Sequence, residues 1–195
     1  MSEEREKRRR DQRVGVDLGL TGQEKEWLLR VARTVIESRV LGRPVPEFKP
    51  PSERLNEKRG AFVTLKKGDE LRGCIGSIRA SRPLYKTVAA MAEEAAFNDP
   101  RFPPVSPQEL DDLDIEISVM TPLTRVENVE EIEVGKDGIY IEKGFYSGLL
   151  LPQVATEYGW DRTTFLEHTC YKAGLHKDAW KEKETKIYKF SADIF

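Results

Sequence analysis

Hydrophobic residues recur every three or four positions in several parts of the chain, which is the spacing of one face of an α-helix. The longest stretch places Leu28, Val31 and Val35 on one side of a helix. Thr21 and Glu24 have the spacing of a capping box at its start, and Ser106 and Glu109 have the same spacing at the start of a predicted helical turn. The predicted helices cover residues 23–40 and 83–98, with one more starting at Pro152 and a last one between Asp161 and Gly174.

Other segments alternate between apolar and polar residues, as in half-buried strands. The clearest covers residues 113–120, and residues 61–65 and 71–78 flank a short turn that contains glycine, which predicts a hairpin. Later strands are predicted at residues 139–142, 145–151 and 186–190. Because the strands and helices do not alternate regularly, the pattern predicts an α+β fold with a mainly antiparallel sheet flanked by helices.

Length and charge favour a single well-solvated globular domain. The chain has 195 residues, of which 38% are hydrophobic and 34% charged. We expect a flexible charged arm at residues 1–20, which includes Arg8-Arg9-Arg10, and one domain over residues 21–195. No apolar run reaches the roughly 20 residues of a membrane span, and residues 1–19 lack the apolar core of a secretory signal. These features predict a cytoplasmic protein without membrane association.

The charge balance and the cysteines exclude further classes. The net charge of -2 lacks the basic excess of a dedicated nucleic-acid binder, so we expect no nucleic-acid partner. Cys74 and Cys170 are expected to be free thiols, because cytoplasmic proteins rarely form disulfides. The two histidines do not combine with them at a recognisable metal spacing, and the chain carries no glycine-rich phosphate loop or dinucleotide motif. No metal and no cofactor are therefore predicted.

The segment from Leu71 to Gly76 is the strongest candidate for a site. In a strand, Arg72 and Cys74 share a face, and a guanidinium beside a thiol favours the nucleophilic thiolate. Gly73 and Gly76 leave the backbone open to a ligand. Cys74 is thus a candidate catalytic nucleophile, with these three neighbours as candidate ligand contacts. In the alternative interpretation, Cys74 is a buried core residue and the two glycines make room for a packed helix. Arg72 then forms hydrogen bonds to a proline-rich loop.

Three more polar residues are candidate ligand contacts. Asp99 and Arg101 lie in a proline-rich loop, and Glu116 lies on the strand predicted at residues 113–120. Each has a plainer interpretation as well, because an arginine between Pro100 and Phe102 often clamps a loop, and a carboxylate on an alternating strand usually faces solvent.

The motifs themselves resemble a known family. Leu71-Arg72-Gly73-Cys74-Ile75-Gly76 is similar to the signature hexapeptide of the AMME-type domain family. The resemblance continues from about residue 22 to residue 195, through the segments Ala95-Ala96-Phe97-Asn98-Asp99-Pro100-Arg101-Phe102, Ile115-Glu116-Ile117-Ser118-Val119, Gly148-Leu149-Leu150-Leu151-Pro152-Gln153 and Lys172-Ala173-Gly174-Leu175.

The resemblance implies a fold with two unequal lobes and a cleft near the signature strand, but it implies no firmly assigned reaction. Similar prokaryotic proteins act as one component beside a Memo-type protein and a radical S-adenosylmethionine enzyme, which are the partners that the resemblance implies. The leading hypothesis is a component that binds an unknown small molecule or a partner, with or without enzymatic activity. The alternatives are an enzyme with Cys74 as nucleophile, a nucleic-acid-associated housekeeping adaptor, and a structural scaffold for the companion proteins.

Overall fold

The computed structural model describes residues 15–195, so most of the predicted arm, including Arg8-Arg9-Arg10, lies outside the described residues. The described chain forms two compact units of unequal length. The large unit comprises residues 18–122 and 193–195, and the small unit comprises residues 15–17 and 123–192. The polypeptide therefore leaves the large unit after residue 122 and rejoins it at residue 193.

A three-stranded antiparallel sheet forms the centre of the large unit. Its strands are β1 (Ala61–Lys67), β2 (Glu70–Ser77) and β3 (Leu113–Met120). β1 pairs with β2 on one side and with β3 on the other, so β2 is an edge strand. The β1–β2 turn contains Gly68 with a positive φ of 60°, which glycine adopts without strain. The hairpin confirms the prediction from the sequence.

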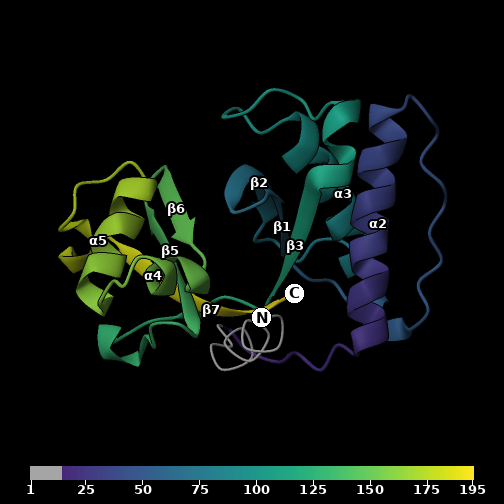
Figure 1. Ribbon diagram of the computed structural model, residues 1–195. Coiled ribbons are helices and arrows are strands. Elements are labelled where there is room, and N and C mark those ends of the chain that lie inside the picture. Colours follow the sequence, from purple (N-terminus) through teal and green to yellow (C-terminus); the bar gives the residue numbers. More distant parts are fainter. Residues whose placement is uncertain (1–14) are drawn as a thin grey trace, which may run out of the picture. The chain divides into compact units, whose positions relative to one another are not determined.

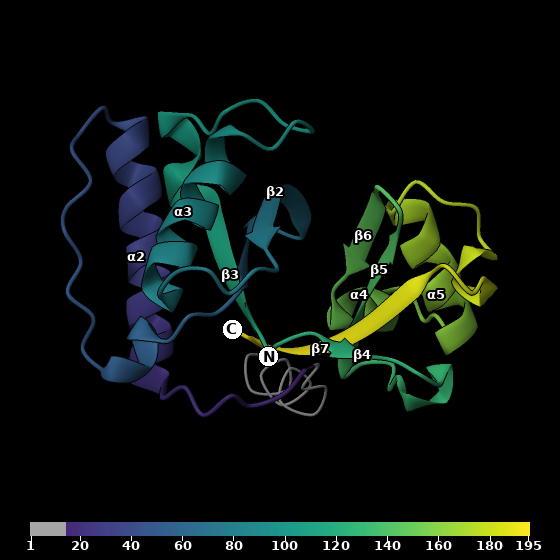
Figure 2. The same ribbon diagram turned by 180° about the vertical axis from the view of Figure 1, so that it is seen from behind.

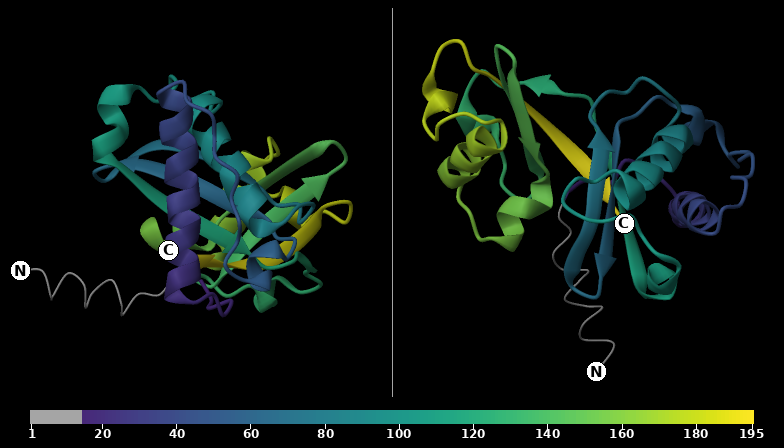
Figure 3. Two further views of the ribbon diagram at one scale, coloured as in Figure 1. Left: turned by 90° about the vertical axis from the view of Figure 1, so that its right-hand side faces the viewer. Right: turned by 90° about the horizontal axis from the view of Figure 1, so that it is seen from above.

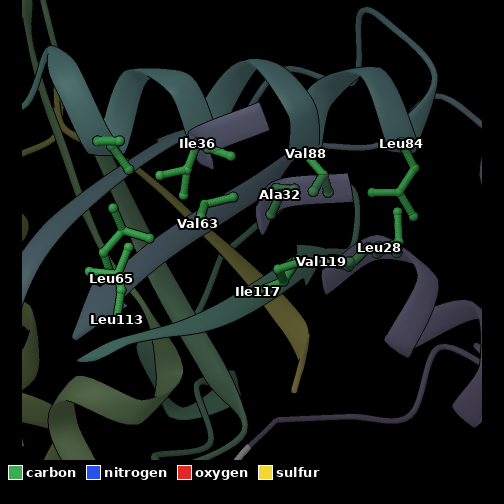
Figure 4. Close-up of a cluster of buried hydrophobic side chains, with 14 of the residues drawn as sticks. Leu28, Ala32, Ile36, Val63, Leu65, Leu84, Val88, Leu113, Ile117 and Val119 are labelled. Atoms are coloured by element: carbon green, nitrogen blue, oxygen red, sulfur yellow. The ribbon is translucent and has the colours of Figure 1, made fainter. Parts of the chain in front are cut away.

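Two helices cover one face of this sheet (Figures 1 and 2). They are α2 (Gly22–Val40), which begins with the predicted capping box of Thr21 and Glu24, and α3 (Leu84–Phe97). Apolar side chains from both helices meet those of β1 and β3 (Figure 4). The labelled buried residues are Leu28, Ala32, Ile36, Val63, Leu65, Leu84, Val88, Leu113, Ile117 and Val119. Because strand side chains alternate, the intervening polar residues lie on the opposite face.

The proline-rich segment after α2, residues 43–52, runs back alongside that helix (Figures 1 and 3). Phe48 packs edge-to-face on Trp27 of α2, with ring centroids 6.3 Å apart, which attaches the segment to the helix. The large unit also contains two short 3₁₀ helices, which are η1 (Glu53–Asn56) and η2 (Pro107–Asp112). The second begins with the predicted capping box of Ser106 and Glu109.

Residues 193–195 complete the large unit. The amide and carbonyl of Phe195 pair with the carbonyl and amide of Ile117 at 3.1 and 2.8 Å. Asp193 accepts a hydrogen bond from the Leu18 amide at 3.2 Å and an ion-pair contact from Lys25 Nζ at 2.5 Å. Segments that are far apart in the sequence thus meet beside β3.

The small unit is a four-stranded antiparallel sheet with helices on one face (Figure 2). The strand order is β4-β7-β5-β6, with α4 and α5 packed on Ile139, Ile141 and Ile187. The elements are β4 (Thr124–Arg125), η3 (Val129–Glu131), β5 (Asp137–Lys143), β6 (Tyr146–Leu150), α4 (Pro152–Glu157), α5 (Arg162–Lys172), η4 (Ala179–Lys181) and β7 (Lys186–Ile194).

These elements confirm the predicted α+β class and the mainly antiparallel pairing. β7 continues four residues beyond the predicted end at Phe190, because Ala192 continues the buried alternation of the strand. The cleft that the family resemblance implies stays a prediction. Among residues 15–195, no helix combines the length and apolar character needed to cross a membrane.

Candidate functional site

The signature segment lies on the edge strand β2 and contains a β-bulge. The pairing with β1 passes from Leu65–Gly73 to Lys66–Leu71, so Arg72 is an extra residue without a partner in the ladder. The bulge interrupts the alternation that would place the side chains of Arg72 and Cys74 on one face. The Arg72 guanidinium instead donates to both carboxylate oxygens of Glu109, at 2.7 and 3.2 Å. The expected pairing of Arg72 with the thiol is therefore wrong.

A row of four polar side chains crosses β2, β1 and β3 on the face opposite the helices. Its members are Cys74, Thr64, Lys66 and Glu116. Thr64 lies opposite Cys74 in one ladder and opposite Glu116 in the other. The Thr64 Oγ1 atom is 3.2 Å from the Cys74 Sγ atom, and Lys66 Nζ donates to Glu116 Oε2 at 3.0 Å. This polar row brings a thiol, a hydroxyl, a carboxylate and an ammonium group together on one surface.

Asp99 and Arg101, in the loop after α3, close the edge of the sheet at Cys74. The Asp99 carboxylate accepts hydrogen bonds from the Cys74 amide at 2.8 Å, the Arg101 amide at 3.1 Å and the Arg101 guanidinium at 2.9 and 2.7 Å. Arg101 also donates to the Cys74 carbonyl oxygen at 3.3 Å. Side chains thus bind the two Cys74 backbone groups that a further strand would use.

Asp99 and Arg101 differ in burial. Asp99 is only 4% exposed, whereas the Arg101 side chain is 47% exposed. The hydrogen bonds from Arg101 hold the pKa of the Asp99 carboxyl well below its usual range, against the opposing effect of burial. The structure therefore fixes a solvent-accessible guanidinium beside Cys74 by means of a buried, ionised carboxylate.

A second carboxylate is held in the same way. The hydrogen bonds from Arg72 lower the pKa of Glu109 to about 2, and the Ser106 amide adds to this effect. The Arg72 side chain is buried except for 11% of its surface, and its guanidinium carbon lies 5.9 Å from the centre of the Phe102 ring. Arg72 thus links β2 to η2 and to the loop that carries Arg101.

The thiol of Cys74 is not activated in the way that the sequence suggested. Burial raises the pKa of Cys74, while the Thr64 hydrogen bond and the charge of Arg101 oppose this effect only in part. The nearby carboxylates of Asp99 and Glu116 raise the pKa further. The cation that acts on the thiol is thus Arg101 rather than Arg72, and the shift is opposite to the expected one.

We expect Cys74 to be alkylated faster than Cys170 in the native protein, because Cys170 is fully buried and Cys74 is partly exposed. The rate at Cys74 should keep rising with pH beyond the ordinary thiol pKa, since its own pKa is raised. Mass-resolved alkylation at a series of pH values measures both rates. Arg72→Met should leave this pH profile unchanged, and a shifted profile in that variant would contradict the geometry described here.

The two glycines of the signature segment leave space that other parts of the protein fill. A Cβ atom on Gly73 would lie 2.3 Å from the Ala95 carbonyl oxygen of α3. A Cβ atom on Gly76 would lie 2.1 Å from the ring of Phe62, its neighbour across the ladder. These contacts agree with the alternative interpretation, in which the glycines admit close packing, and the predicted ligand contacts at both positions stay predictions.

The structure brings Cys74, Asp99, Arg101 and Glu116 together and directs Arg72 toward Glu109. No motif in the sequence indicates the roles of Thr64 and Lys66, which only the register of β1 against its neighbours reveals. Glu109 was recognised as part of a capping box, but nothing near it in the sequence indicates its pairing with Arg72.

No group of three histidine, cysteine, aspartate or glutamate side chains within residues 15–195 has the arrangement of a metal site. Both histidines lie in the small unit, where His168 stacks on Trp160 at 3.9 Å between ring centroids and His176 contacts Glu182 at 2.6 Å. The large unit therefore offers Cys74 no histidine of its own as a general base.

Comparison with known proteins places these features in a family. The AMMECR1 family pattern matches residues 29–195. A protein of Thermococcus gammatolerans is 50% identical over 183 residues, which covers 87% of this chain and 88% of that protein. A protein of Methanopyrus kandleri is 48% identical over 185 residues, with coverage of 90% and 89%. The crystal structure of an uncharacterised protein from Pyrococcus horikoshii is 43% identical, with a TM-score of 0.85 and coverage of 90% and 92%.

Proposed function

This chain belongs to the AMMECR1 family, and we propose that it is a small-molecule-binding component whose ligand contacts the polar row and the neighbouring Arg101. The observation that carries the proposal is the position of Arg101. Its guanidinium is fixed by the buried Asp99 and by the Cys74 carbonyl, yet almost half of its side chain remains exposed. A cation that is held in place without a ligand loses little conformational freedom when it binds one.

The side chains of the polar row add further ligand-binding groups beside Arg101. The Cys74 thiol lies 3.2 Å from the hydroxyl of Thr64, which is buried, and Glu116 and Lys66 offer opposite charges on β3 and β1. A ligand with both an anionic group and hydrogen-bond donors matches this set, because binding sites combine a few fixed polar groups with a rigid scaffold.

The proposal favours binding over nucleophilic catalysis by Cys74. Nucleophilic attack requires the thiolate, and burial disfavours it here. Association with a Memo-type protein and a radical S-adenosylmethionine enzyme, and residence in the cytoplasm, stay predictions.

The test is to capture small molecules from a metabolite extract with the purified full chain and to identify them by mass spectrometry. We expect the wild-type protein to retain at least one compound that Cys74→Ser and Glu116→Gln retain less well. Each variant removes one group of the row without adding volume, so the fold should persist.

Lys136→Gln is the matched control, because Lys136 is exposed in the small unit and pairs with Glu133, three residues away. This variant should retain the same compounds as the wild type. The proposed site would be refuted if the wild type retained no compound, or if all four proteins retained the same compounds equally well.

A further inference from the structure

The small unit carries a second surface, on the face of its sheet opposite α4 and α5. Tyr140 on β5 lies directly opposite Tyr188 on β7, and both side chains project from this face because their neighbours Ile139, Ile141 and Ile187 point toward the helices. Two tyrosines therefore lie side by side at the centre of the sheet, and both are partly exposed.

The hydroxyl groups of these tyrosines determine how the rings lie. The Tyr140 and Tyr188 hydroxyls each lie 3.4 Å from a carboxylate oxygen of Glu142, which is two residues further along β5 on the same face. Both hydroxyls therefore reach toward the same carboxylate. The two ring centroids are 5.8 Å apart with an angle of 41° between the planes, so the rings form one aromatic surface.

Two cations border this aromatic surface. The Arg125 guanidinium carbon lies over the Tyr188 ring, 5.3 Å from its centre, and Lys186 Nζ donates to Glu142 at 3.1 Å. Both cations keep access to solvent, with side chains 39% and 57% exposed. Arg125 pairs with Glu127 at 3.9 Å. The two cations and the two carboxylates, Glu127 and Glu142, balance in charge, and the two cations are the groups that an anion can contact here.

We propose that this face of the small unit binds a mononucleotide whose base carries an amino group. A base stacks on the flat side of a tyrosine ring, and Arg125 and Lys186 supply the charge that a phosphate requires. Glu142 accepts hydrogen bonds, so an amino group on the ring suits it better than a carbonyl group does. Two cations suffice for one phosphate but not for a long strand, whose affinity depends on many phosphate contacts.

The surface lies in the small unit and the polar row in the large unit, and the two differ in chemistry, so the two proposals stand or fall separately. The binding of AMP, adenosine and ribose 5-phosphate to the full chain can be compared by calorimetry. We expect AMP to bind more tightly than either of the other two, because only AMP contains both the ring and the phosphate. Ribose 5-phosphate binding as well as AMP would refute a role for the tyrosines.

Three variants test the individual contacts. Tyr140→Leu should weaken AMP binding roughly fivefold or more, since it removes a stacking ring. Tyr140→Phe keeps the ring and should bind AMP almost as well as the wild type, which separates lost stacking from lost folding. Tyr158→Leu is the matched control, because Tyr158 is an exposed tyrosine of the same unit that stacks on Trp160, outside the proposed surface.

The outcomes decide between one nucleotide and a strand. Unchanged AMP binding in Tyr140→Leu, equal weakening in the Tyr158→Leu control, or no AMP binding by the wild type would each overturn the proposal. A ten-nucleotide single strand should bind no more tightly than AMP at physiological salt. Much tighter binding of the strand would overturn the assignment to a mononucleotide and favour a nucleic-acid surface.

Discussion

Replacement of Asp99 by alanine is expected to lower the free energy of unfolding by about 3 kcal/mol. The Asp99 carboxylate is buried and accepts hydrogen bonds from the Cys74 amide and from the amide and guanidinium of Arg101. Without it, the Cys74 amide has lost its partner at the edge of the sheet, and Arg101 has lost the group that orients it. Urea denaturation at neutral pH measures the change.

The same contact makes the stability depend on pH. The pKa of Asp99 is lowered in the folded state, so its stabilising contribution is present above the pKa of the unfolded chain, near 4, and is lost as the pH falls below that value. Wild-type protein should therefore lose more stability than Asp99→Ala between pH 5 and the acid limit of the measurement. Asp178→Ala is the matched control, because it removes an exposed aspartate that pairs with Lys181. If Asp178→Ala lowers the free energy of unfolding at neutral pH as much as Asp99→Ala does, this account is contradicted.

Replacement of Gly73 by alanine is expected to destabilise the large unit by about 3 kcal/mol, or to prevent folding. The new Cβ atom would lie 2.3 Å from the Ala95 carbonyl oxygen, which belongs to the backbone of α3 and cannot move without the helix. The strand and the helix would have to separate, with loss of contacts in the core that they share. Thermal unfolding followed by circular dichroism measures the effect.

Gly22→Ala provides the comparison for Gly73→Ala. A Cβ atom on Gly22 would meet no atom within 4 Å, and the residue lies in the first turn of α2. Alanine also favours the helix more than glycine does, so this variant should be as stable as the wild type or slightly more stable. If both substitutions destabilise the protein equally, close packing of α3 on β2 is not the reason for glycine at position 73.

The elements of this fold could be predicted because their signals are local. The alternation over residues 113–120 and the capping boxes at Thr21 and Ser106 depend only on neighbouring residues, and the structure has the corresponding strand and helices. The end of β7 was harder to predict, because its last residues pair with β3 through contacts that are distant in sequence.

The candidate site could be predicted only in part. Cys74, Asp99, Arg101 and Glu116 were identified from their residue types and motifs, but their contacts depend on which strands pair and in which register. The inference that Arg72 activates the thiol assumed unbroken alternation along β2. A bulge is decided by cross-strand pairing rather than by the residues of one strand, so the sequence alone could not reveal it.

The return of the chain to the large unit at residue 193 has a consequence for the order of events during synthesis. Residues 18–122 leave the ribosome first, but Asp193 and Phe195, which bind Lys25 and Ile117, follow Pro122 by about 70 residues. At 5–20 residues per second, roughly 4–14 s separate the two segments. During this interval the Ile117 backbone lacks its partner, while the residues of the small unit emerge. A nascent chain in this period exposes an unpaired strand edge that chaperones can recognise.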